Sequence, residues 1–525
     1  MPLFRFFLVM VLILLNFFAA QGQKTEKEQG DDPPMRIEFP AKSDKETYRV
    51  IPCDTAGAII FFRSVESAGE NQTKWYFSSY DTDLNQQWTK NIPLMSDQDF
   101  FDYRLYNDTL ALFFTHSGKT PKSGITGYQV LRIVLPKGVF ILNGGKLPQD
   151  GVLDATGIRY DHFWLGLNKE KGAGEIGYLQ MTTGRFKTFP AGLGSSIRIE
   201  WIGPDHDGST VTAVVSRKVA KKSTEYYLVT YDTTGKILNE IPFYVNNQGQ
   251  DLTHFQVRDV SAGNQILAGS YGQQATASKT RPGETAGRAG LFTAKLADRT
   301  VQSLNFYNFL ELDHAGSYIS EKERMELQRK AEKKNKTLKD FSVGFSTLQH
   351  ELVPWNDQFL MITEVYSPLY HTESFTEIDY YGRPYTNSYS VFDGYQFTVG
   401  IITGISNEGK LLWDNTIDFR NLISFDLTPK ITLFHQGNDL VLCYMAEGKI
   451  GSKIIRTNQV IEKTRFSTLE MMYPEDKLVT ESRSRIVKWY DQFFLTYGYQ
   501  EIKNIALPGE NKRLVFFISK VKFDL

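Results

Sequence analysis

The sequence predicts an all-β protein, and three observations lead to this prediction. Aromatic residues, which favour strands, make up 14% of the 525 residues. Short apolar runs follow turn-forming Asn, Asp and Gly residues along most of the chain. Amphipathic helical patterns are almost absent, which argues against helices alternating with parallel strands.

One motif, a short polar turn followed by an apolar run, recurs along the chain. The second residue of this turn falls at positions 57, 108, 161, 208, 264, 357, 439 and 491. Most intervals are 47–56 residues, whereas the intervals that end at 357 and 439 are 93 and 82 residues. Two copies, at residues 355–359 and 489–493, are nearly identical. Such self-similarity indicates a repeat architecture.

Several periods contain a second turn between two strand-like runs, as at residues 80–83, 231–236 and 406–410. Two hairpins per period make a four-stranded antiparallel unit, and units of this size in series are the blades of a β-propeller. Eight turns favour eight blades. Seven blades are the alternative, because the spacing after residue 310 is loose.

The ends of the chain predict how the ring closes. The last repeat supplies only three strands, at residues 486–487, 493–497 and 514–521, while residues 35–39 form a strand-like stretch before the first repeat. We expect this N-terminal strand to pair as the outer strand of the last blade, because such a closure covers sheet edges.

Residues 406–413 carry an Asp-x-x-Gly-Lys-x-x-Trp-like pattern, with weaker copies at residues 81–88 and 232–239. This pattern resembles the repeat of quinoprotein-type eight-bladed propellers, which the outer-membrane assembly propellers of Gram-negative bacteria share. That family uses the tryptophan to lock neighbouring blades together, and Trp88 and Trp413 match it. Ser406 and Asn239 depart from the pattern, and Gly and Lys are missing after Asp81. The resemblance implies a propeller and transfers no quinone-binding or calcium-binding residues.

The N-terminus has the layout of a secretory signal. Arg5 precedes an apolar run at residues 6–18, and small residues follow at Ala20 and Gly22. We expect residues 1–22 to be a cleaved signal peptide and the mature protein to be secreted or periplasmic. A signal anchor is the alternative, although the apolar run is shorter than the roughly 20 residues that cross a bilayer. Residues 23–34 indicate a polar linker.

We interpret residues 35–525 as a single propeller domain with two insertions. A helix is predicted at about residues 318–341, where Ser320 and Glu323 form a capping-box pattern. An aromatic loop is predicted at about residues 366–395. No membrane span is expected after signal cleavage, because no second apolar stretch approaches 18 residues.

Composition excludes several function classes. The net charge of −1 argues against a nucleic-acid partner, which requires a positive field. Two cysteines, Cys53 and Cys443, exclude a disulfide scaffold, and we expect both to be free and buried rather than bridged. We find no metal-ligand spacing among the eight histidines and no nucleophile elbow or Walker loop, so we assign no catalytic, cofactor or metal residue.

The aromatic segment supplies the candidate binding residues. Tyrosine combines a flat apolar ring with a polar tip and suits protein or sugar surfaces. The alternative is that the segment folds back on the propeller and buries its rings. The candidate residues are Tyr370, His371, Phe375, Tyr380, Tyr381, Tyr385 and Tyr389.

These observations favour a secreted, non-catalytic propeller that binds a protein or glycan partner through its loops. One alternative is an extracytoplasmic polysaccharide hydrolase or lyase, whose acids would come from different blades and therefore leave no linear motif. A second alternative is an envelope-assembly scaffold, which rests on the quinoprotein-type resemblance.

Overall fold

The computed structural model describes residues 35–523 apart from short gaps. The gaps are residues 43–47, 118–124, 149–150, 170–171, 193, 195, 221–222, 247–249, 262, 274–286, 315–317, 320, 334–343, 379 and 507–511. Arg36–Leu525 form one compact unit. The predicted signal peptide and linker, residues 1–34, lie outside the described residues.

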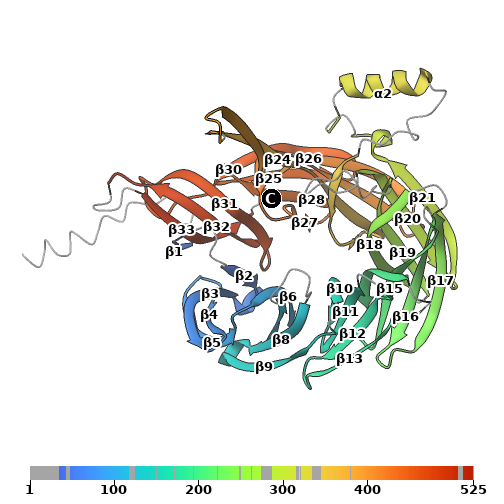
Figure 1. Cartoon of the computed structure of the whole chain (residues 1–525), viewed down its shortest axis with the longest axis horizontal. Coiled ribbons are helices and arrows are strands. Elements are labelled where there is room, and N and C mark those ends of the chain that lie inside the picture. Colours follow the sequence, from blue (N-terminus) through green and yellow to red (C-terminus); the bar gives the residue numbers. More distant parts are fainter. Residues whose placement is uncertain are drawn as a thin grey trace, which may run out of the picture. The chain divides into compact units, whose positions relative to one another are not determined.

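Eight antiparallel sheets follow one another along the chain, and we number them as blades 1 to 8 (Figure 1). Blade 1 contains β2 (Arg49–Pro52), β3 (Ala58–Gly69), β4 (Gln72–Tyr80) and β5 (Gln86–Met95). Blade 2 contains β6 (Gln98–Tyr106), β7 (Thr109–Ser117), β8 (Ile125–Val134) and β9 (Val139–Lys146). Blade 3 contains β10 (Gly151–Arg159), β11 (His162–Lys169), β12 (Glu175–Gln180) and β13 (Arg185–Pro190). Blade 4 contains β14 (Ile197–Pro204), β15 (Thr210–Ala220), β16 (Ser223–Asp232) and β17 (Ile237–Asn246).

Blade 5 contains β18 (Gln250–Ser261), β19 (Asn264–Gln273), β20 (Arg288–Ala297) and β21 (Thr300–Asn308). Blade 6 contains β22 (Ser346–Gln349), β23 (Val353–Trp355), β24 (Gln358–Ile378), β25 (Pro384–Ser406) and β26 (Leu411–Ser424), and both β22 and β23 pair with β24. Blade 7 contains β27 (Thr432–Gln436), β28 (Asp439–Ala446), β29 (Lys449–Arg456) and β30 (Gln459–Thr468). Blade 8 contains β31 (Lys477–Lys488), β32 (Phe493–Lys503), β33 (Lys512–Lys522) and β1 (Arg36–Pro40).

Helices are few among the described residues. The α-helix α2 (Glu321–Lys333) lies in the connection between blades 5 and 6, inside the range where the sequence predicts a helix. Ser320 is not described, so the predicted capping box lies outside the described residues. Three short 3₁₀ turns complete the inventory: η1 (Asp54–Ala56), η2 (Leu135–Lys137) and η3 (Phe309–Glu311).

Eight buried apolar clusters lie between the blades, one in each gap. Seven of them join successive blades, from blades 1 and 2 to blades 7 and 8. The eighth joins blade 8 to blade 1 and includes Val50 and Ile60 from one side and Leu495 and Phe516 from the other. An open row of eight sheets has seven gaps, so the eighth cluster closes the ring. The chain is an eight-bladed β-propeller, and the seven-blade alternative is wrong.

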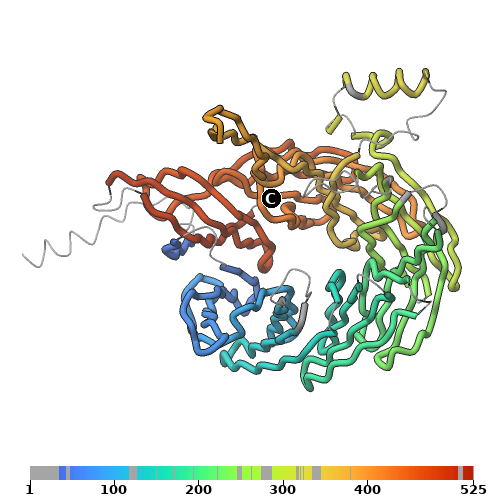
Figure 2. The backbone as a smooth tube through the Cα atoms, in the orientation of Figure 1, coloured from blue at the N-terminus to red at the C-terminus, as the bar shows by residue number. Residues whose placement is uncertain are grey.

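Strand β1 closes the ring as the sequence predicts. It pairs antiparallel with β33, from Arg36 opposite Ser519 to Pro40 opposite Val515, and becomes the outer strand of blade 8. Figure 2 shows this short blue segment beside the red C-terminal strands. The first and last parts of the described chain therefore share one sheet.

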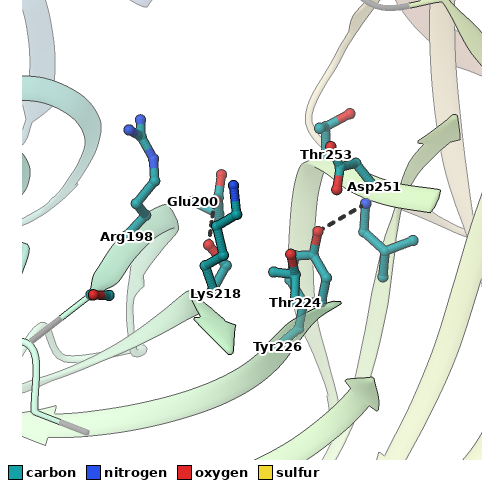
Figure 3. A pocket seen from close by; sticks show the side chains of 10 residues that line it. Arg198, Glu200, Lys218, Thr224, Tyr226, Asp251 and Thr253 are labelled. Atoms are coloured by element: carbon teal, nitrogen blue, oxygen red, sulfur yellow. Dashed lines mark hydrogen bonds between the residues drawn. The ribbon is translucent and has the colours of Figure 1, made fainter. Parts of the chain in front are cut away.

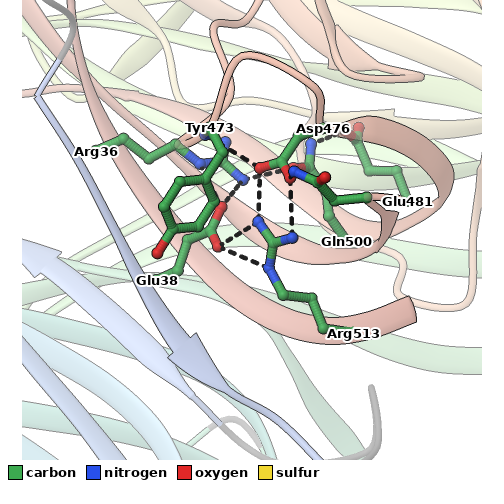
Figure 4. A network of polar contacts seen from close by, with 8 residues as sticks. Arg36, Glu38, Tyr473, Asp476, Glu481, Gln500 and Arg513 are labelled. Atoms are coloured by element: carbon green, nitrogen blue, oxygen red, sulfur yellow. Dashed lines mark hydrogen bonds and ion pairs between the residues drawn. The ribbon is translucent and has the colours of Figure 1, made fainter. Parts of the chain in front are cut away.

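A buried ionic network pins β1 to blade 8 (Figure 4). Arg513 makes two hydrogen bonds to Asp476, with Nη1–Oδ1 and Nη2–Oδ2 distances of 2.9 and 2.6 Å, and its Nη2 lies 3.1 Å from Glu38 Oε2 on β1. Arg36, also on β1, donates to Glu38 Oε1 and to Gln500 Oε1, both at 2.8 Å. The side chain of Asp476 is fully buried, and Glu38 is 6% exposed.

The repeat turns contain residues with positive φ, because each turn joins the first two strands of a blade through only two to five residues. The residues with positive φ at these turns are Gly57, Asn107, Tyr160, Gly208, Gly263, Asn356, Asp357, Gly437 and Asp491. At Gly57, with φ of 97°, an added Cβ would lie 1.9 Å from the Tyr80 carbonyl oxygen. The same residue accepts a hydrogen bond from Trp489 Nε1 of blade 8 at 2.7 Å, so this turn also joins the two end blades.

The tryptophans of the repeat pattern lie at the gaps between blades. Trp88 on β5 packs edge-to-face on Phe140 of blade 2, with ring centroids 5.6 Å apart. Trp413 on β26 belongs to the cluster between blades 6 and 7. Cys53 and Cys443 are free and buried, as expected, and they belong to different clusters. Burial raises the pKa of the Cys53 thiol to about 12.

Replacing Arg513 with Ala is expected to lower the free energy of unfolding by about 3–5 kcal/mol, because it leaves the buried Asp476 without its cation and removes one of the two cations that pair with Glu38. Urea unfolding followed by circular dichroism measures this change. The matched control is Lys512→Ala, which removes an ion pair to Glu501 from a lysine side chain that is 56% exposed, and should cost less than about 1 kcal/mol. Equal effects of the two substitutions would contradict a closing role for the network.

The same network predicts acid sensitivity. Burial alone would raise the pKa of Asp476, but hydrogen bonds from Arg513 and Asn504 outweigh it and hold the pKa below its usual 3.8. A carboxyl with a lowered folded-state pKa contributes stability above its unfolded pKa, and this contribution is lost as the pH falls through the folded value. The stability of Arg513→Ala should therefore change less than that of the unaltered protein between pH 5 and 2.

Candidate functional site

The two long strands of blade 6 form a hairpin that extends beyond their neighbours. β22 pairs with β24 only at residues 363–366, and β26 pairs with β25 only from Tyr395 onward. Residues 371–378 pair with residues 384–391, from His371 opposite Val391 to Ile378 opposite Pro384. We call residues 371–391 the arm. Figure 2 shows it in orange, projecting from blade 6.

The arm is a β-hairpin, so the prediction of a loop is wrong in conformation. Polar Thr and Ser residues alternate with aromatic and acidic residues on both strands, and this period of two is typical of strands. The alternative of a segment folded back on the propeller is also wrong, because residues 371–378 and 384–390 are exposed. Only the ends of the predicted range are buried: Tyr366 packs edge-to-face on Tyr395, with ring centroids 5.4 Å apart.

Alternation gives the arm two different faces, because successive side chains of a strand point to opposite sides. One face is made of small hydroxyl residues: Thr372, Ser374, Thr376, Thr386, Ser388 and Ser390. The opposite face is aromatic and acidic: His371, Glu373, Phe375, Glu377, Tyr385, Asn387 and Tyr389. Ring contacts occur on this second face, where Phe375 and Tyr389 lie 6.1 Å apart between centroids.

The structure brings four candidate residues together on this aromatic–acidic face, namely His371, Phe375, Tyr385 and Tyr389. Two others, Tyr380 and Tyr381, lie at the tip and are 96% and 78% exposed. Tyr370 lies at the base of the arm, half-buried against Phe392 with ring centroids 5.5 Å apart. The acidic members of the face, Glu373 and Glu377, are functional candidates that an aromatic search misses.

Hydrogen bonds hold the aromatic–acidic face in place. The hydroxyl of Tyr389 donates to Glu373, and that of Tyr385 donates to Glu377. These bonds raise the pKa of both tyrosines, and the bonds from Tyr389 and His371 lower the pKa of Glu373. Glu373 therefore stays ionised at neutral pH.

His371 links this face to the base of the arm. Its Nδ1 lies 2.6 Å from Asp393 Oδ1, and its Nε2 lies 3.3 Å from Glu373 Oε1. Hydrogen bonds to Asp393 and then Glu373 raise the pKa of His371 above its usual 6.5. Both ring nitrogens donate in the charged form, so the imidazolium bridges the two acids.

A second feature is a cavity of about 310 Å³ between blades 4 and 5 (Figure 3). It lies where the apolar cluster of these blades ends, since Tyr226 and Leu252 belong to both. The lining residues are Ser196, Arg198, Glu200, Ser216, Lys218, Thr224, Tyr226, Asp251, Leu252 and Thr253. Sequence reasoning missed this site, because its two carboxylates are about one blade apart in the chain.

The carboxylates of the cavity have altered acidity. Burial raises the pKa of Glu200, and the nearby Asp154 and Asp251 raise it further against the effect of a 2.6 Å hydrogen bond from Ser216. Burial also raises the pKa of Asp251. The two lining acids, Glu200 and Asp251, come from the first strands of blades 4 and 5.

None of the described helices is long and apolar enough to cross a membrane. The described part of the chain also contains no group of three or more His, Cys, Asp or Glu side chains placed to hold a metal ion.

Comparison with known proteins assigns no family to this chain. No protein-family model matches the sequence, and no curated protein matches it. Among solved structures, the β-propeller domain of the Trilobed protease from Pyrococcus furiosus is 8% identical, with a TM-score of 0.33, covering 79% of this chain and 97% of that domain. A post-proline cleaving enzyme from Rickettsia typhi is 9% identical, with a TM-score of 0.36, covering 89% of this chain and 58% of the enzyme.

Prolyl oligopeptidase B from Galerina marginata is 7% identical, with a TM-score of 0.36 and coverage of 88% of this chain and 56% of that one. The chain thus spans little more than half the length of the prolyl peptidases it matches. At these identities and TM-scores the similarities carry no argument about activity.

The geometry at His371 predicts an imidazole that titrates above pH 6.5. A group with a raised folded-state pKa favours the charged bridge at low pH and loses it as the pH rises through the raised value. A titration followed by NMR of the His371 ring measures this pKa. Asp393→Asn should lower it, since the main hydrogen-bonding carboxylate is removed. A value at or below 6.5 in the unaltered protein would show that the bridge does not form.

Proposed function

We propose that this protein is an exported, non-catalytic β-propeller that binds a protein partner through the aromatic–acidic face of its arm. The observation that carries the proposal is an exposed, ordered face of aromatic rings and carboxylates on a hairpin that covers no core. None of residues 371–391 belongs to the apolar clusters of the described chain. A surface that contributes nothing to the core indicates a role outside folding.

The face is suited to binding because its polar groups are already held. Tyr385 and Tyr389 are tied to Glu377 and Glu373, so little side-chain freedom is left to lose when a partner arrives. Tyrosines that combine a large ring with few rotatable bonds are frequent in binding hot spots. The exposed tip residues, Tyr380 and Tyr381, enlarge the available contact area.

Charge and backbone favour a protein over a glycan. Glu373, Glu377 and Asp393 are acidic and complement a partner with basic residues. Among the described residues, no strand pairs with either outer edge of the arm. Unpaired edges accept an extended strand through main-chain hydrogen bonds, a common mode of peptide recognition. We therefore expect a partner that presents an extended, basic segment.

The proposal that the protein is exported rests on residues 1–22, which contain a charged start, an apolar run and small residues near the end. Secretion would place the arm where it meets other extracytoplasmic proteins.

Replacing residues 372–390 with Asn-Gly, which joins His371 to Val391 through a two-residue turn, is expected to abolish partner capture and leave the fold intact. Affinity capture from extracytoplasmic extracts, followed by mass spectrometry, measures the first effect. Thermal unfolding measures the second, because the removed residues lie outside the core.

Point variants separate the two faces. Phe375→Ser, Tyr385→Ser and Tyr389→Ser together should reduce partner affinity about a hundredfold or more. The matched control, Thr372→Ala, Ser374→Ala and Ser388→Ala on the hydroxyl face, should change it less than about threefold. Unchanged capture by the aromatic triple variant would remove the arm as the binding element. If the protein captures only a glycan, the proposal of a protein partner is wrong.

A further inference from the structure

The cavity between blades 4 and 5 is lined by polar side chains, and the described residues do not supply hydrogen-bond partners for all of them. The exposed Lys218 and the half-buried Asp251 both line the cavity, where Asp251 interacts electrostatically with Lys218 and Arg288. The hydroxyl oxygen of Thr253 is buried and has no hydrogen-bond partner among the described residues. A buried hydroxyl without a partner is costly, so the presence of Thr253 in a cavity lined by charged groups points to a ligand.

The strand pattern directs these groups to one place. Arg198 and Glu200 alternate on β14 with the buried Ile197 and Ile199, so both polar side chains share one face. Ser216 lies opposite Arg198 in the sheet register. Figure 3 shows Glu200 and Lys218 on one side of the cavity and Asp251 with Thr253 on the other.

The lining combines donors and acceptors with balanced charge. Two cations, Arg198 and Lys218, accompany two carboxylates, Glu200 and Asp251. Arg198 is paired with Asp154 at 3.3 Å, and Arg288 lies near Asp251 in addition to Lys218, so three cations face three carboxylates and no strong net charge is left to attract an ion. The other polar lining side chains all carry hydroxyl groups: Ser196, Ser216, Thr224, Tyr226 and Thr253.

We infer that this cavity binds a neutral saccharide unit. Sugar hydroxyls both donate and accept, which matches a cavity with one carboxylate on each side and with ammonium and hydroxyl groups beside them. Leu252 and the ring of Tyr226 supply a small apolar wall for the carbon face of the sugar. The volume lies at the small end of the roughly 300–1,000 Å³ range of ligand pockets, which suits one or two sugar rings.

This site is independent of the arm, which belongs to blade 6, so the two proposals can fail separately. The probe is an array of neutral oligosaccharides built from glucose, galactose, mannose and N-acetylglucosamine, followed by calorimetric titration of any that bind. The full chain and the variant that lacks residues 372–390 should bind the same oligosaccharide with equal affinity. If this variant loses partner capture but still binds the sugar, the result supports both proposals.

Two variants test the assignment of residues. Asp251→Ala should weaken sugar binding about tenfold or more, because it removes a charged acceptor. Thr253→Val is isosteric and removes a buried hydroxyl without a partner, so it should weaken sugar binding while thermal stability stays equal or rises. The matched control is Asp259→Ala, an exposed acid further along the same strand, which should leave binding unchanged.

Three outcomes would overturn the inference: no neutral oligosaccharide binds, only charged ligands bind, or both cavity variants bind as the unaltered protein does. Cleavage of a bound oligosaccharide that disappears in Glu200→Gln would support the site. It would also favour the hydrolase alternative over a purely binding role.

Discussion

The packing of apolar side chains between successive sheets is the constraint on which the molecule depends. Every blade has a neighbour on both faces, so its middle strands are buried on both sides. Strands β11 and β28 show this, with buried residues at six or seven consecutive positions. Eight apolar clusters fill the eight gaps between the sheets. The cluster between blades 8 and 1 forms only when residues from both ends of the described chain meet. Closure is therefore a property of the whole chain.

The same constraint explains which parts of the fold could be predicted from sequence. Doubly buried strands produce continuous apolar runs, and tight turns need Asn, Asp or Gly, so both signals are local. Counting strands in the last repeat then predicted the closing role of residues 35–39. The partners of β1 inside blade 8, such as Asp476, were not predictable, because a buried ion pair between distant residues leaves no spacing pattern.

The candidate sites were predictable to different degrees. The density of tyrosines pointed to residues 366–395, but it concealed the alternation with Ser and Thr that makes a hairpin with two unlike faces. Residue type alone identified Tyr380 and Tyr381 as candidates. Glu373 and Glu377 become candidates only once the strand register places them opposite Tyr389 and Tyr385. The cavity left no signal, since Glu200 and Asp251 meet only after two blades have packed. Both sites lie where the packing between blades ends. The arm is a pair of strands that extends beyond the neighbouring strands, and the cavity lies at the polar end of the gap between blades 4 and 5.

Hydrogen–deuterium exchange of the β1 segment is the measurement that bears most directly on ring closure. If β1 is the outer strand of blade 8, amides of residues 36–39 that face β33 exchange as slowly as those of β33 itself, and they become labile together with the cluster between blades 8 and 1. Rapid exchange throughout residues 36–39, while β32 and β33 stay protected, would contradict closure by the N-terminal strand.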